Sequence, residues 1–381
     1  MKERTHGFLY GLNMWVEGER GWFVGEHIQA LFEWDYNTHM CRLISALPDY
    51  DEIRFCGNSK CVKHKEYIYC LPQAGKCIWI YDLQKHVFDK IEIDNPLDIK
   101  MRMDYVGRKG NEIFLFSHGL KKLFKINGEH KKIVNEYLFG NESDIYSNFL
   151  FMNDKILTYH SNRSAILSFD ISRGEVVEED IPELKDRVNA FCFDGEKYWF
   201  TGRKTELYIW YPVTGVIECM KEFSDEFRWC YEKKDTAFGQ VLCEGENIWV
   251  FQYRVNRTLC INKDTKEILE IDLGDWREDK FYEGTPMSFQ YMVDERYAGL
   301  YSWKEHRIIE VDLQQKNWCY KELIDGPAIA EFLRKNPKWY KYYFGEGVLH
   351  KMFFGEMMEE DSKKELVRME KHIGMSIHDR M

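Results

Sequence analysis

Basic and titratable side chains recur along this sequence at intervals of about 40 to 50 residues, in short polar segments between apolar runs. Few acidic residues accompany them, mainly Glu26 and Glu305. Arginine donates paired hydrogen bonds and lysine supplies a compact charge, so these types suit a phosphate, a uronic acid or an acidic peptide. The recurring residues are His27, Lys76, His118, His160 with Arg163, Arg203 with Lys204, Arg254 with Arg257, and Lys304 with His306.

This spacing leads to the hypothesis that one face of the protein binds an anionic group. On a chain of net charge −11, such a cluster would focus a positive potential locally. The alternative is that lysine and arginine simply solvate exposed hairpin tips and guard strand edges. The residues predicted to contact the ligand are His27, His118, His160, Arg163, Arg203, Arg254, Arg257, Lys304 and His306.

A second group combines aromatic rings with arginines just before several expected strands. Aromatic faces beside hydrogen-bonding side chains hold sugars and flat ligands, although the same residues also pack the ends of sheets. The group consists of Tyr50, Arg54, Arg102, Tyr146, Arg187, Arg228, Trp229, Trp276 and Arg277.

No motif for catalysis is present: the sequence has no nucleophile elbow, P-loop, GxGxxG or HExxH. His118, His160 or His306 would suit general acid–base chemistry, but spacing does not show that any two converge. We therefore predict no catalytic residue.

Four cysteines and a histidine lie within 22 residues, at Cys56, Cys61, His64, Cys70 and Cys77. They lack the close CxxC pairs typical of structural zinc sites. Small buried thiols are common in protein cores. We expect no metal and no other cofactor.

The elements that must position these residues repeat too. An alternating apolar run ends at a turn-forming residue seven times, with separations of 47, 45, 43, 42, 50 and 50 residues. Such a period, with three or four strands per unit, is typical of propeller blades. One small twisted sheet cannot bury both faces, so the units must pack radially. The turn formers are Asp35, Asp82, Asn127, Asp170, Pro212, Asn262 and Asp312.

The innermost strand of each unit is predicted to begin with a small or polar residue, as a narrow wetted channel requires. Six of the seven aligned positions carry a small or polar residue, and Leu12 is the exception. Gly239 is the smallest of the six. The predicted channel-lining side chains are Asn58, Asp104, Ser147, Asn189 and Ser288. In such a ring, the loops joining second and third strands open beside the channel mouth. The prediction is an all-β, seven-bladed β-propeller of four-stranded antiparallel blades with a helical C-terminal extension.

From residue 8 to 323, the chain resembles bacterial kelch-like and WD-like propellers in period and strand pattern. The resemblance implies the architecture alone. The paired glycines of kelch blades and the GH…WD pair of WD40 blades are missing, so no functional residue is carried over.

The domain prediction is a propeller over residues 1–326 and a helical, aromatic-rich extension over 327–381. Pro327 stands near a helix start, followed by Ile329, Phe332 and Leu333 at helical spacing. One alternative is that the extension covers a face or edge of the propeller, and the other is that it docks a partner or a second copy.

Composition limits the remaining classes. The net charge of −11 argues against a general nucleic-acid binder. The first residues have no apolar run of signal-peptide length, and no stretch is long enough to span a membrane. Eleven cysteines without a pairing pattern fit reduced thiols, so we expect a cytoplasmic protein.

The expected function is recognition without catalysis: a binding or scaffold propeller with an anionic small molecule, a glycan or a protein as partner. The alternative is a lyase- or hydrolase-type enzyme acting on an anionic saccharide or a related small molecule. The sequence leaves the ligand's identity and the oligomeric state open.

Overall fold

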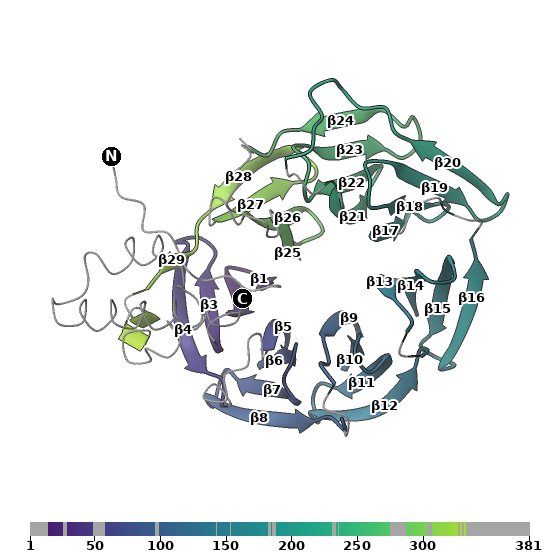
Figure 1. Cartoon of the computed structure of the whole chain (residues 1–381). Coiled ribbons are helices and arrows are strands. Elements are labelled where there is room, and N and C mark those ends of the chain that lie inside the picture. Colours follow the sequence, from purple (N-terminus) through teal and green to yellow (C-terminus); the bar gives the residue numbers. More distant parts are fainter. Residues whose placement is uncertain are drawn as a thin grey trace, which may run out of the picture.

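The structure is a computed structural model (Figure 1). It describes residues 14–25, 29–48, 58–95, 99–141, 143–152, 154–181, 184, 188–230, 234, 236–274, 287–302, 307–326, 328–329 and 331–332, with only the backbone at 58–59, 287–288 and 325. These residues form seven antiparallel sheets of four consecutive strands, and the first sheet gains a fifth strand. The sheets stand in a ring around a central axis, which confirms the predicted propeller (Figure 1).

The strands of each blade follow one another from the axis outward. The first two blades contain β1 (Met14–Glu17), β2 (Arg20–Val24), β3 (Ala30–Asp35), β4 (Met40–Ala46), β5 (Asn58–His64), β6 (Tyr67–Pro72), β7 (Cys77–Asp82) and β8 (Val87–Glu92). The next two contain β9 (Met103–Lys109), β10 (Glu112–Ser117), β11 (Lys122–Asn127), β12 (Lys132–Leu138), β13 (Tyr146–Met152), β14 (Lys155–His160), β15 (Ala165–Asp170) and β16 (Glu175–Asp180).

The last three blades repeat this order and complete the ring. They contain β17 (Ala190–Phe193), β18 (Tyr198–Thr201), β19 (Leu207–Tyr211), β20 (Val216–Met220), β21 (Phe238–Glu244), β22 (Asn247–Gln252), β23 (Thr258–Asn262), β24 (Ile268–Ile271), β25 (Met287–Val293), β26 (Tyr297–Ser302), β27 (Arg307–Asp312) and β28 (Asn317–Lys321).

The hydrophobic core is divided among the junctions between blades. Each of seven apolar clusters in the described chain draws its buried residues from two adjacent blades. For example, the ring centre of Phe116 in the third blade lies 4.4 Å from that of Phe149 in the fourth. A blade therefore buries the apolar side chains on both faces of its sheet only by contact with both neighbouring blades, which is the physical reason for the ring.

The predicted turn formers end the third strand of each blade. In six blades the side-chain oxygen at this position accepts two backbone N–H groups of the following hairpin; Asp82 Oδ1, for instance, accepts from Gln84 and Lys85 at 2.9 Å each. The same geometry recurs at Asp35, Asn127, Asp170, Asn262 and Asp312. Proline has no such acceptor, and at Pro212 the turn is closed by backbone bonds to Tyr211 O instead.

Ring closure uses a strand that the repeat pattern did not predict. β29 (Ile324–Asp325) pairs in parallel with β4, with Ile324 opposite Met40 and Asp325 opposite Cys41. Residues 328–329 and 331–332 are helical, and Ile329 is fully buried in the cluster between the seventh and first blades. The start of the C-terminal extension therefore packs against this junction. The rest of the predicted extension lies outside the described residues.

Candidate functional site

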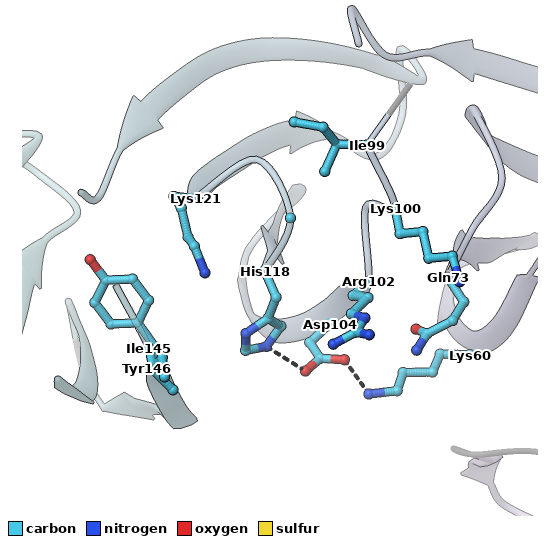
Figure 2. A pocket seen from close by; sticks show the side chains of 11 residues that line it. Lys60, Gln73, Ile99, Lys100, Arg102, Asp104, His118, Lys121, Ile145 and Tyr146 are labelled. Carbon is cyan, nitrogen blue, oxygen red and sulfur yellow. Dashed lines mark hydrogen bonds and ion pairs between the residues drawn. The ribbon is translucent and has the colours of Figure 1, made fainter. Parts of the chain in front are cut away.

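The loops between second and third strands open at the same end of the ring as the segments leading into the first strands, as expected. A cavity of about 650 Å³ lies there, between the second, third and fourth blades (Figure 2). Four of its lining side chains are permanent cations, and one is a carboxylate. The lining residues are Lys60, Gln73, Ile99, Lys100, Arg102, Asp104, His118, Gly119, Lys121, Ile145 and Tyr146, and we call this space the cationic cavity.

Asp104 lies at the centre of a three-residue contact in this cavity. His118 Nε2 is 2.9 Å from Asp104 Oδ2, and Lys60 Nζ pairs with Oδ1 of the same carboxylate (Figure 2). Lys60 comes from the innermost strand β5 and Asp104 from β9, so the pair joins two blades. Burial raises the pKa of Asp104, but the charge of Lys60 and the hydrogen bond from His118 outweigh it and hold that pKa well below its usual range.

The single carboxylate is thus already neutralised, and three further cations line the same space. Among the described residues, Lys100, Arg102 and Lys121 have no carboxylate within ion-pair distance. Burial lowers the pKa of Lys121; the nearby charge of Arg102 adds to this and that of Asp144 opposes it. The described lining of the cavity therefore carries an excess of positive charge on a protein whose net charge is −11.

Backbone hydrogen bonds fix the loops that carry these side chains. Arg102 N donates to Gln73 O at 2.9 Å, and His118 N donates to Arg102 O at 3.2 Å. Arg102 has a φ of 45°, in the left-handed region that non-glycine residues seldom occupy. Gly119 passes so close to the backbone of Lys100 that a Cβ would lie 2.0 Å from its carbonyl oxygen. Glycine at this position lets the two loops meet.

Tyr146 forms the wall of the cationic cavity on the side of the fourth blade. Its hydroxyl donates to Phe139 O at 2.7 Å, and Lys121 Nζ lies 6.0 Å from the centre of its ring. Burial, with the charge of Asp144, raises its pKa. Because the hydroxyl is buried and occupied, Tyr146 contributes a rigid wall to the cavity rather than a titrating group.

Tyr146 also lines a smaller cavity of about 290 Å³ at the junction of the fourth to sixth blades. Two predicted channel residues, Ser147 and Asn189, and one predicted ligand residue, Arg203, meet there. The remaining lining residues are Ser161, Val188 and Thr236. We call this the polar cavity.

Four predicted ligand residues are engaged elsewhere. His160 is buried, with Nε2 3.3 Å from Asp144 Oδ1 and Nδ1 accepting from the backbone N–H of Arg163 at 3.2 Å. The Arg163 guanidinium pairs with Glu178 at 3.0 Å. Arg257 pairs with both Glu226 and Asp272, at 2.8 and 2.5 Å, while Arg254 lies over the ring of Tyr253 at 5.3 Å.

The remaining predicted residues lie partly or wholly outside the description. His27, Lys304 and His306 are outside the described residues. Asn58 and Ser288 stand at or near the start of the inner strands β5 and β25, as expected, but only their backbone is described. Asp104, Ser147 and Asn189 occupy the corresponding positions in their blades.

Three cations of the cationic cavity were missed from the sequence. Lys60 follows an irregularity in the register of β5 and β6, so strand alternation does not assign its side chain to a face. Lys100 and Lys121 stand in the same polar segments as Arg102 and His118, so their position in the sequence could have identified them as candidate ligand residues.

No group of three or more metal-ligating side chains occurs among the described residues. No helix in the described part of the chain has the length and apolarity needed to cross a membrane.

Solved structures share this fold at low sequence identity. Virginiamycin B lyase from Staphylococcus aureus matches with a TM-score of 0.56 and 13% identity, over 78% of this chain and 92% of that one. A catalytically inactive His-to-Ala variant of that lyase with quinupristin matches at 0.58 and 13%, over 81% and 96%. A chain of the mitotic checkpoint complex matches at 0.53 and 8%, over 85% and 90%. No protein-family model and no curated protein matches the sequence. At these identities the likeness shows the fold alone.

Proposed function

We propose that this protein is a recognition protein that binds an anionic small molecule in the cationic cavity, without transforming it. One observation carries the proposal: among the described residues that line the cavity, four are cations and the one carboxylate, Asp104, is already paired with Lys60 and His118. An incoming carboxylate or phosphate would supply the missing negative charge. Charge-assisted hydrogen bonds of this kind are shorter and stronger than neutral ones.

The cavity's position supports this function. It lies at the channel mouth, walled by three blades, so a ligand there would be partly removed from water and the charge interactions would strengthen. Lys100 and Arg102 lie on one segment that is fixed by the neighbouring loops. This segment would therefore lose little conformational entropy when a ligand binds. The negative charge of the rest of the chain would disfavour large polyanions and leave small ones as the preferred ligands.

Calorimetric titration of the full chain would test this proposal with two pairs of probes: galacturonate against galactose, and glucose 6-phosphate against glucose. We expect at least one anion to bind and its neutral counterpart not to bind. Arg102→Gln and Lys100→Gln should each weaken binding about tenfold, the effect of one charge-assisted bond. Lys132→Gln, at an exposed position on the outer strand β12, is the matched control and should change nothing.

Equal binding of charged and neutral probes, or full affinity in both cavity variants, would overturn the proposal. If neither anion binds at low ionic strength, the proposal is also wrong. An acidic peptide that binds in place of both probes would point to a protein partner and the scaffold alternative.

A second candidate function rests on the orientation of His118. Asp104 accepts from Nε2, which fixes the tautomer and leaves Nδ1 without a hydrogen-bond partner among the described residues. An imidazole held by a carboxylate in this way suits a general base. On a uronic acid, removal of the C5 proton with cleavage of the C4–oxygen bond would form a C4=C5 double bond, and the proton would pass to the leaving oxygen. The propeller fold accommodates lyase chemistry in its structural neighbours.

This candidate has a separate test. Incubation with oligogalacturonate would produce an unsaturated product with ultraviolet absorbance, and His118→Gln would abolish it. Binding of galacturonate without any unsaturated product would favour recognition alone.

A further inference from the structure

The polar cavity deepens the proposed function by limiting the length and class of the ligand. It adjoins the cationic cavity, because Tyr146 lines both. The two spaces are therefore neighbours over the second to sixth blades, on either side of Tyr146. This inference rests on the proposed anion-binding function of the cationic cavity.

The chemistry of the polar cavity differs from that of its neighbour. Three hydroxyl side chains, one amide and one cation line it: Ser147, Ser161, Thr236, Asn189 and Arg203. Asn189 Nδ2 donates to Phe238 O at 2.7 Å, which fixes the amide and leaves its oxygen as an acceptor. Hydroxyls that both donate and accept, beside an amide oxygen, match the alternating donors and acceptors of a sugar ring.

Two features of the residues around this cavity are costly to the folded protein. Ser147 Oγ is buried and has no hydrogen-bond partner among the described residues. A buried hydroxyl without a partner loses its hydration and gains nothing in return. Thr236 has a φ of 58°, although a β-branched side chain is particularly unfavourable in the left-handed region. Such costs gather at binding sites, where the geometry is held ready for a partner.

We propose that the ligand is an acidic oligosaccharide of at least two units. One unit places its carboxylate among Lys100, Arg102 and Lys121, and the adjoining unit places its hydroxyls in the polar cavity, on the other side of Tyr146. Arg203 binds the carboxylate or a hydroxyl of this second unit. Recognition then depends on chain length as well as on charge.

Titration of the full chain with galacturonate, digalacturonate and trigalacturonate tests this inference. The wild-type protein should bind the dimer at least tenfold more tightly than the monomer, since a second set of hydrogen bonds forms. Arg203→Gln should remove about tenfold of dimer affinity and leave monomer affinity unchanged. Arg102→Gln should weaken both. Arg173→Gln, at an exposed position in the hairpin between β15 and β16 and outside both cavities of the proposed site, serves as the matched control.

Ser147→Ala provides a readout that a purely structural role would not give. Removal of an unpartnered buried hydroxyl should leave the melting temperature equal to or above that of the wild type, while dimer affinity falls about threefold to tenfold. A variant that loses stability and monomer binding together would contradict a ligand role for Ser147.

The outcomes separate this inference from the proposed function. If the monomer binds but the dimer binds no more tightly, or if Arg203→Gln weakens both equally, the two-part site is wrong and the anion site stands. If only glucose 6-phosphate binds, the saccharide class is wrong while anion recognition stands. If a short glutamate peptide gains affinity with length and digalacturonate does not, the ligand is a peptide and the inference is overturned. If no anion binds, both proposals fail.

Discussion

His118 Nε2 lies 2.9 Å from Asp104 Oδ2, and the second oxygen of the same carboxylate pairs with Lys60 on the adjacent blade. Asp104 therefore links the second and third blades and fixes the imidazole at the same time. The contact matters for both candidate functions, because Asp104 and His118 are the one carboxylate and the one histidine among the described lining residues, and the contact neutralises the first and orients the second. Substitution of Asp104 separates these two effects.

Asp104→Asn should leave anion affinity equal or raise it a few-fold at low ionic strength, because the variant keeps the shape and removes the carboxylate found among the described lining residues. If the protein is an enzyme, the same change should reduce turnover by orders of magnitude, since an amide can present the wrong group to the imidazole and cannot stabilise its charged form. Titration and product assay on one sample distinguish the outcomes. A loss of affinity of tenfold or more would show that Asp104 contacts the ligand instead.

Arg102 combines a charge with a left-handed backbone, and two substitutions separate these properties. Arg102→Gly should weaken anion binding about tenfold while the free energy of unfolding changes by less than about 1 kcal/mol, because glycine tolerates the φ of 45°. Arg102→Val should weaken binding equally and also destabilise the fold by about 1–2 kcal/mol, because its branched Cβ is strained there. Denaturant titrations measure both. Equal stability of the two variants would show that the loop relaxes.

His64 should make the stability of the second and third blades depend on pH. It is buried against Gly128, and neither ring nitrogen has a hydrogen-bond partner among the described residues. Burial lowers its pKa below the ordinary value of 6.5, and the charges of Arg108 and Lys65 add to this, while Glu129 and Glu66 oppose it. The unfolded chain then binds a proton that the folded chain resists.

The sign follows from this difference. The contribution of a neutral His64 is complete above about pH 7.5 and is lost as the pH falls through 6.5 toward the lower folded pKa. The free energy of unfolding should therefore decrease over that window in the wild type and change less in His64→Leu. His130→Gln, at an exposed position, should retain the wild-type slope. An identical slope in His64→Leu would show that other groups control the dependence.

Glu310 should be the polar contact that most strongly closes the ring. Its Oε2 accepts from Tyr36 Oη at 2.5 Å and from Tyr291 Oη at 2.9 Å, so it joins the first and last blades across 274 residues of chain. Burial, with the charge of Glu310, raises the pKa of Tyr291 well above its usual value, which keeps this hydroxyl protonated and donating.

Tyr36→Phe removes the donor from the first blade to the buried carboxylate of Glu310 and should lower the free energy of unfolding by about 1–3 kcal/mol. Tyr81→Phe removes a hydroxyl from a contact within a single blade and serves as the control, with a smaller expected loss. Denaturant unfolding followed by tryptophan fluorescence measures both. Equal losses in the two variants would mean that Glu310 has no special part in ring closure.

Much of the architecture was predictable because the signals are local and repeated. A turn former after each third strand makes its hydrogen bonds within three residues of itself, as at Asp82 and Asn127. Since such contacts need only the neighbouring chain, the sequence indicates them directly.

The candidate site was predictable only in part. His118, Asp104, Arg102 and Tyr146 were each noted, but never as one set, since only Arg102 and Tyr146 stood in the same group. Their convergence in one cavity depends on how neighbouring blades stack. Arg257 shows the opposite outcome: from the sequence it was an available cation, but Glu226 and Asp272 neutralise it in the fold.

The sequence by itself determined the number of blades and the strand order within each, because periodic burial and local turn chemistry operate within 50 residues of chain. The tertiary structure alone decided which charges stay uncompensated. Lys60 meets Asp104 across 44 residues and Tyr36 meets Glu310 across 274, and charge interactions depend on distance in space rather than along the chain.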